Sequence, residues 1–221
     1  MGTPRPLILE IGCNDGVDSL RFLQLFPEAR LYCFDPEPRA TRAWRERMAA
    51  YVAAGRCELD EIALSCASGE APFHQSSGTT AGAHKQDWDL SGSLNPPTGH
   101  LEQSPWCKFE STITVTTRTL DEVAHEKRLL ALPLDGSPAI DLIWLDVQGG
   151  ERNVLLGGPQ TLAVTRYLYL EFNHWRKPLY AGQMDLQQTL DQLGSQWEPR
   201  GIYEGYNLLA RNRRYGRTAA L

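Results

Sequence analysis

Short apolar runs alternate with helical patterns along this chain, and this alternation limits the fold more than any other feature. The runs PLILEI, residues 6–11, and IDLIWLD, residues 140–146, have the length and composition of buried strands. After the first run, residues 17–26 place apolar side chains on one stripe of a helix. Such alternation is typical of a parallel sheet covered by helices. The sequence therefore predicts an α/β fold.

Other segments extend this pattern. We expect further strands at 30–34, 58–65 and 167–172, a strand passing into a helix at 112–123, helices at 38–55, 149–158 and 184–193, and two antiparallel strands within 201–212. Residues from about 74 to 110 lack a pattern, and unpatterned stretches of this length in compact domains are usually lids, binding loops or disordered segments. We therefore expect a variable lid or substrate loop there, and a short solvated tail at 213–221.

Length and composition indicate one domain over residues 1–221. The formal net charge of −5, with mixed signs, argues against a nucleic-acid partner, and no apolar run reaches the ~20 residues that a membrane span needs. The five cysteines are scattered without a C-x-x-C pair, and the N-terminus has no signal-peptide profile. We therefore expect a cytoplasmic protein with reduced thiols and no membrane partner. The oligomeric state is not readable from the sequence.

The segment LEIGCNDG, residues 9–16, has the composition of a ligand-binding turn between the first strand and its helix. In folds of this kind, ligands bind where the first strand passes into its helix, and glycines there let the backbone approach closely. The pattern of Gly12, Asn14 and Gly16 differs from the G-x-G-x-x-G expected for NAD. Glu10 precedes it, and an acid suits an ammonium or sulfonium group better than a pyrophosphate.

A second acid, Asp35, ends the next predicted strand, about 20 residues further on, where ribose hydroxyls are bound in such folds. One carboxylate for an amino-acid moiety and another for a ribose together describe S-adenosylmethionine. The alternative is a simple strand-turn-helix, with Asp15 as the helix N-cap and Asp18 completing a capping box.

Several motifs resemble, in order and spacing, those of the FkbM-type S-adenosylmethionine-dependent methyltransferases over nearly the whole chain. They are LEIGCNDG at 9–16, CFDPEP at 33–38, EIALS at 61–65, SGSL at 91–94, TRTLDEV at 117–123, IDLIWLDVQGGERNVLLGG at 140–158 and LYAGQ at 179–183. The resemblance implies a single-domain, Rossmann-like class I fold. Its mostly parallel seven-stranded sheet has helices on both faces and an antiparallel C-terminal strand.

The resemblance also implies methyl transfer from S-adenosylmethionine, usually to an oxygen of a sugar, glycan or polyketide-type molecule. The expected cofactor-binding residues are Glu10, Gly12, Asn14, Asp15, Gly16, Asp35, Pro36, Ala63 and Asp146. Two positions depart from the family pattern, because Asp35 and Gln148 stand where many members have Glu. An amide cannot act as a base, so an acid role at position 148 is not expected.

Acids at the ends of later strands are the candidates for chemistry. A hydroxyl acceptor needs alignment with the methyl donor and removal of a proton. Asp146 ends the most apolar strand, Glu171 ends the next, and His174 follows closely. In one hypothesis, His174 or Asp146 is the general base. In the other, Asp146, Glu171 and Asn173 hold Mg²⁺, which orients the hydroxyl.

Each candidate also has a purely structural interpretation. Asp146 is suited to cap the helix near residue 150, and His174 to lie in an exposed loop. Tyr180 is compatible with packing or with substrate contact. Trp88 and Trp106 are compatible with lid packing or with stacking on a sugar or aromatic acceptor.

Other functions stay open at this point. The turn at 9–16 also fits, less well, an NAD-binding oxidoreductase, and a non-catalytic domain that binds S-adenosylmethionine is a further alternative. An RNA methyltransferase is disfavoured by the acidic charge balance, although residues 211–217 are basic. The sequence does not identify the small-molecule or sugar acceptor.

Overall fold

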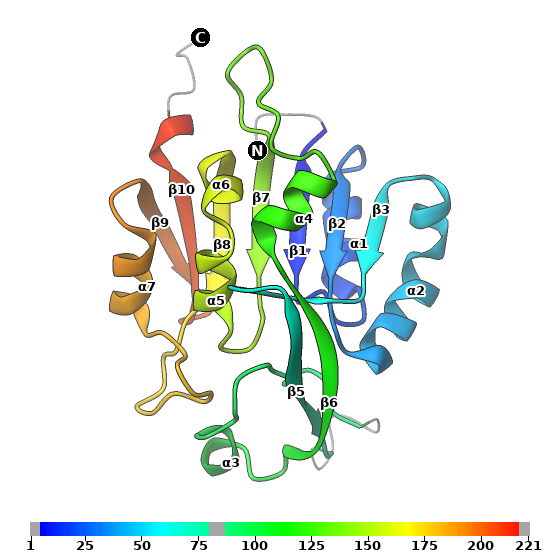
Figure 1. Cartoon of the computed structure of the whole chain (residues 1–221), viewed down its shortest axis with the longest axis vertical. Coiled ribbons are helices and arrows are strands. Elements are labelled where there is room, and N and C mark those ends of the chain that lie inside the picture. The colour runs from blue at the N-terminus through cyan, green and yellow to red at the C-terminus, as the bar shows by residue number, and fades with distance from the viewer. Residues whose placement is uncertain (1–4, 80–86, 217–221) are drawn as a thin grey trace.

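One seven-stranded sheet organises the part of the chain that the computed structural model describes, residues 5–79 and 87–216. Its strands are β1 Leu7–Ile11, β2 Arg30–Phe34, β3 Cys57–Asp60, β7 Ile140–Leu145, β8 Thr165–Glu171, β9 Trp197–Tyr203 and β10 Asn207–Asn212. The strand order is β3-β2-β1-β7-β8-β10-β9, with β10 antiparallel to both of its neighbours and the remaining pairs parallel (Figure 1). The predicted mostly parallel sheet with antiparallel C-terminal strands is confirmed.

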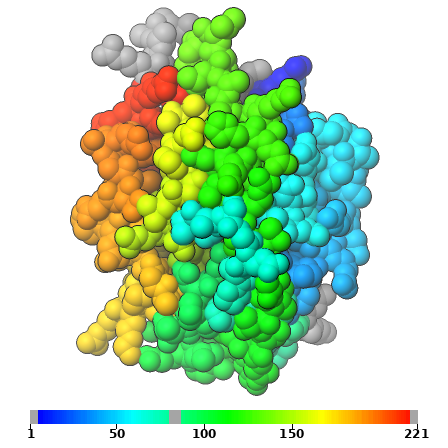
Figure 2. All heavy atoms as spheres, in the orientation of Figure 1, coloured from blue at the N-terminus to red at the C-terminus, as the bar shows by residue number. Residues whose placement is uncertain are grey.

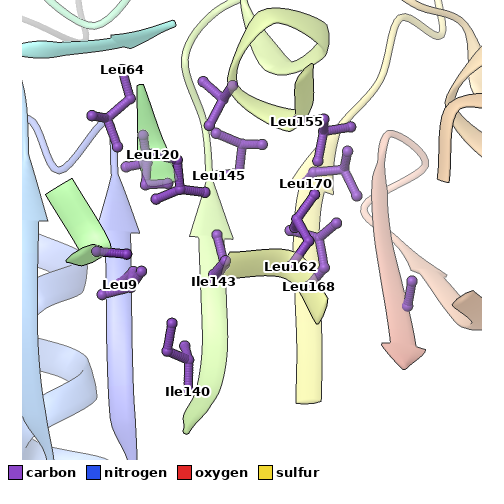
Figure 3. Packing of buried hydrophobic residues seen from close by; sticks show 14 of the residues in the cluster. Leu9, Leu64, Leu120, Ile140, Ile143, Leu145, Leu155, Leu162, Leu168 and Leu170 are labelled. Atoms are coloured by element: carbon purple, nitrogen blue, oxygen red, sulfur yellow. The ribbon is translucent and has the colours of Figure 1, made fainter. Parts of the chain in front are cut away.

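Helices lie on both faces of this sheet, as predicted. They are α1 Val17–Leu25, α2 Pro38–Ala53, α4 Leu120–Glu126, α5 Glu151–Leu156, α6 Pro159–Ala163 and α7 Leu186–Leu193. Successive residues of a strand point to opposite faces, so each central strand feeds two cores. Leu9, Ile143 and Leu168 face the helices α4 to α7 (Figure 3), whereas Ile8 packs with Trp44 on the side of α1 and α2.

A second, three-stranded sheet stands at the carboxyl ends of the parallel strands. Its strands are β4 Ala63–Ser65, β5 Gly69–Ser77 and β6 Lys108–Thr119, in the order β4-β6-β5. Figure 1 shows the β5–β6 hairpin and the short helix α3, His100–Gln103, beyond that edge of the main sheet.

This second sheet corrects two expectations. The single strand predicted at 58–65 is two strands in different sheets, because the chain turns after Asp60, where the N–H of Ile62 donates to the Asp60 carbonyl. The stretch 74–110 begins and ends in β5 and β6, which place few apolar side chains inward and so give no alternating pattern. Its residues 80–86, including His84, lie outside the described part of the chain.

The ends of two elements also differ from expectation. The capping box is wrong: Gly16 is the N-cap of α1, with φ of 80°, and no side-chain cap hydrogen bond. Asp15 instead accepts from the N–H of Val17 at 3.1 Å, and Asp18 pairs with Arg21.

The predicted tail begins with structure. Residues 213–215 form a 3₁₀ turn whose Tyr215 hydroxyl donates to the Ala163 carbonyl at 3.3 Å, and residues 217–221 are outside the described part. No helix in the described ranges is long and apolar enough to cross a membrane.

Candidate functional site

A cavity of about 500 Å³ lies where β1, β2 and β7 end. Seven of the nine residues expected to bind the cofactor line it, namely Gly12, Asn14, Asp15, Asp35, Pro36, Ala63 and Asp146. The β5–β6 hairpin and residues 87–95 close the outer side of the cavity. We call residues 87–95 the covering segment. Figure 2 shows this part of the chain filling the end of the molecule beyond the main sheet. The structure thus gathers at one place residues that are far apart in the sequence.

The turn at residues 12–16 packs its backbone directly against the backbone at the ends of β2 and β7. Gly12 has φ of +88°, and its N–H donates to the Phe34 carbonyl at 2.8 Å. A Cβ at this position would stand 1.8 Å from the backbone oxygen of Asp146. Only glycine therefore permits this approach of β1 to the end of β7, which closes the floor of the cavity.

Asp35 presents its carboxylate at the end of β2. Its two oxygens accept from the N–H of Asn14 at 2.8 Å and from the N–H of Glu37 at 2.9 Å. Burial raises the pKa of Asp35 to about 7, against the effect of these hydrogen bonds. Each carboxylate oxygen accepts about two hydrogen bonds, so Asp35 keeps capacity for ligand hydroxyls.

The neighbouring Glu37 is a site residue that the sequence interpretation missed. It lines the cavity and is almost fully buried, with its carboxylate held by the Arg39 side chain and by Gln75 of β5. This network ties the end of β2 to the hairpin. The signal was present in the CFDPEP motif, whose second acid was not assigned.

The covering segment supplies Trp88, Asp89, Leu90 and other lining side chains. Trp88 packs edge-on against Trp106, with ring centroids 4.9 Å apart, and Trp106 does not line the cavity. The side-chain amide of Asn14 donates to the Asp89 carbonyl at 3.4 Å, which joins this segment to the turn.

Glu10 and Gly16, both expected to bind the cofactor, do not line the cavity. Glu10 occupies a strand position that faces α1, so its carboxylate accepts from the Ser19 hydroxyl, and Ser19 in turn accepts from the Trp44 indole. Burial raises the pKa of Glu10 well above its ordinary value. Gly16 packs against the ring of Trp44. Both residues support the turn from beneath.

An acid pair stands at the ends of β7 and β8. Asp146 lines the cavity and is hydrogen-bonded to Glu171, while the amide of Gln148 donates to Asp146 at 2.7 Å and to Glu171 at 3.4 Å. Burial raises the pKa of both acids, and the charge of Asp146 raises that of Glu171 further. Two buried carboxyl groups in hydrogen-bond contact favour a pair that shares one proton.

The loop that carries Asp146 and Gln148 is fixed from both sides. Glu151 accepts from the N–H of Val147 and of Gly149 before α5 begins. The hydroxyl of the buried Tyr180 shares its one proton between the Ser91 carbonyl at 2.8 Å and Gln148 Oε1 at 3.2 Å. Tyr180 thus packs rather than lining the cavity. The N-cap of α5 is Gly150, without a side-chain cap, so Asp146 is not the helix cap.

His174 and Asn173 stand apart from the cavity. His174 is exposed and stacks on Tyr206, with centroids 5.0 Å apart. The Asn173 amide is engaged by the backbone of Trp175, donating at 3.0 Å and accepting at 3.2 Å. Within the described residues, no group of three or more His, Cys, Asp or Glu side chains is arranged to hold a metal ion. The Mg²⁺ hypothesis gains no support.

Comparison with known proteins gives consistent matches. The model of the methyltransferase FkbM domain matches residues 10–196. The chain is 44% identical over 214 residues to the 2-O-methyltransferase NoeI of Sinorhizobium fredii, covering 95% of this chain and 80% of that protein. It is 29% identical over 201 residues to the AMB antimetabolite synthetase AmbE of Pseudomonas aeruginosa, covering 85% of this chain but 9% of that protein.

Among solved structures, the methyltransferase FkbM from Methylobacillus flagellatus superimposes with a TM-score of 0.56 at 11% identity. The match covers 94% of this chain and 44% of the other, so this chain corresponds to less than half of that protein. At this identity the likeness concerns the fold alone.

Proposed function

This chain belongs to the FkbM family of methyltransferases, and we propose that it methylates a hydroxyl group of a small molecule or sugar. S-adenosylmethionine is the methyl donor that the family implies. The observation that carries the proposal is the cavity at the strand ends, with Asp35 at the end of β2 and Asp146 at the end of β7. The name of the relative NoeI, a 2-O-methyltransferase, favours oxygen as the accepting atom.

The residues present fit this donor. Asp35 keeps acceptor capacity for ribose hydroxyls. Apolar side chains of Phe34, Ile62 and Leu64 also line the cavity and suit an adenine ring. The acids Asp15 and Asp146, and others along the cavity, suit a ligand that carries an ammonium and a sulfonium charge. The cavity volume is within the range of small-molecule sites.

We assign the general base to Asp146 rather than to His174. Asp146 lines the cavity, whereas His174 does not. The Gln148 amide donates to one oxygen of Asp146 and favours its ionised form, which a general base requires. When bound, S-adenosylmethionine supplies an electrophilic methyl carbon, whose bond to sulfur breaks as the acceptor oxygen attacks. Asp146 then takes the hydroxyl proton.

The same arrangement disfavours a metal-assisted step. Asn173 turns its amide to the backbone of Trp175, and of the three hypothesised ligands only Asp146 lines the cavity. We therefore expect methyl transfer to be unchanged in excess EDTA. A loss of activity in EDTA that added Mg²⁺ restores would instead support the metal hypothesis.

Calorimetric titration with S-adenosylhomocysteine tests the proposed function directly. Wild-type protein should bind with micromolar affinity, and Asp35→Ala should weaken binding at least tenfold. Asp191→Ala, on the exposed face of α7, is the matched control and should bind as wild type. NADH is titrated in parallel and should not bind. A folded wild type that binds NADH but not S-adenosylhomocysteine would refute the methyltransferase proposal.

A further inference from the structure

Next to the acid pair, on the side away from β1, the chain forms an open rim. We define the rim as residues 173–176, which follow β8, together with residues 204–206, which connect β9 and β10. The two parts are neighbours because β10 pairs with β8, and Asn207 stands opposite Glu171. In Figure 1 the chain after β8 reaches the same end of the molecule as the β5–β6 hairpin.

Aromatic rings form the centre of this rim. The His174 ring stacks on Tyr206, with centroids 5.0 Å apart and 24° between the planes, and lies 4.7 Å from the Trp175 ring. Trp175 is 43% exposed. Its backbone is fixed by two hydrogen bonds to the Asn173 amide, at 3.0 and 3.2 Å. A buried residue thus fixes the backbone that carries this exposed ring, and the ring itself lies against His174.

Polar groups border the rings. Glu204 accepts from the Tyr206 hydroxyl at 3.2 Å and from the Asn207 amide at 3.3 Å, which leaves about half of its acceptor capacity. The rim is also close to the reacting acids, because Asn207, the residue after Tyr206, stands opposite Glu171 in the sheet. Apolar ring faces therefore stand beside hydrogen-bonding groups at the edge of the proposed active site.

We propose that this rim binds a pyranose ring of the acceptor, with the sugar placed against Trp175 and its hydroxyls hydrogen-bonded to Glu204. A pyranose has one face of C–H groups and a periphery of hydroxyls, and the rim offers both complements. A flat apolar acceptor would instead need an enclosed apolar pocket. The rim is open, which also suits a sugar at the end of a longer chain. This inference rests on the proposed function, because it names the acceptor of that site.

Binding tests the rim without requiring turnover. Saturation-transfer NMR is measured on protein saturated with S-adenosylhomocysteine, with a panel of methyl hexopyranosides and methyl 6-deoxyhexopyranosides. At least one glycoside should show transfer with wild type and at least fivefold less with Trp175→Ala. Trp175→Phe should recover most of the signal. Leu156→Ala, a truncation at a 50% exposed position on α5, should behave as wild type.

Methyl transfer from labelled S-adenosylmethionine is the second readout. For an accepted glycoside, Trp175→Ala should raise KM at least fivefold with kcat within twofold, and S-adenosylhomocysteine affinity should not change. Glycoside binding without any transfer would support the rim and contradict the proposed function. Transfer to phenols without glycoside binding, or a Trp175→Ala protein that binds glycosides as wild type does, would overturn the rim.

Discussion

Replacing Gly12 by alanine tests whether the close approach of the turn to β7 shapes the cavity. The added Cβ would stand 1.8 Å from the Asp146 backbone oxygen, whereas ordinary van der Waals contact begins near 3.4 Å. Strand and turn must therefore separate by more than an ångström, and a displacement of about 1 Å costs roughly 100-fold in activity. The φ of +88° adds about 1–2 kcal/mol of backbone strain.

Gly55→Ala is the matched control, because Gly55 has φ of +66° and no atom within 4 Å of its would-be Cβ. It carries only the backbone strain, which corresponds to a Tm lower by roughly 2–8 °C in a domain of this size. Calorimetry and thermal unfolding are run on both variants. Gly12→Ala should lose more Tm than the control and bind S-adenosylhomocysteine at least tenfold more weakly. Equal losses of Tm with intact binding would refute the close-approach argument.

Two further substitutions address the ionised groups. Burial raises the pKa of Asp35 to about 7, so its carboxylate accepts ribose hydroxyls fully only above neutral pH. In calorimetry, S-adenosylhomocysteine should therefore bind the wild type about tenfold more weakly at pH 6 than at pH 8. Asp35→Asn should bind it weakly and without pH dependence. Gln148→Glu removes the donor to Asp146 and adds a third acid, at a cost of about 1–3 kcal/mol. Its Tm should therefore fall by roughly 2–12 °C, and further at pH 8 than at pH 6. The control is Gln187→Glu, since the Gln187 amide donates to Asp191 on an exposed helix face, and this variant should change Tm by less than about 2 °C. An equal fall of Tm in the two variants would contradict the role given to Gln148.

The main sheet was predictable because burial on both faces leaves a continuous apolar run, which residues 140–145 show most clearly. The turn after β1 was predictable because a ligand at this place needs glycines for close approach of the backbone and an acid at the end of the next strand for its hydroxyls. Gly12, Asn14 and Asp35 accordingly line the cavity.

Features that depend on side-chain direction were not predictable. Glu10 and Ile11 are adjacent in the sequence, yet Glu10 faces α1 and Ile11 lines the cavity, since strand side chains alternate. Strand β5 and the first residues of β6 were missed because their side chains are largely exposed, whereas the part of β6 from residue 112 was predicted. The contact of Gln148 with both acids depends on its φ of 53°, which the sequence does not reveal.

The order of the strands has a consequence for the synthesis of the protein. The strands β1 and β7 are neighbours in the sheet, and the N–H of Leu7 donates to Asp141, 134 positions later. A growing chain that has made only β1 and β2 therefore lacks Asp146 and the other cavity residues that follow β7. A ligand that binds only the complete cavity would stabilise chains in which β7 has inserted by about 2.7 kcal/mol at a concentration of 100 Kd. Under the proposed function, S-adenosylmethionine would therefore favour chains that contain β7 over shorter ones.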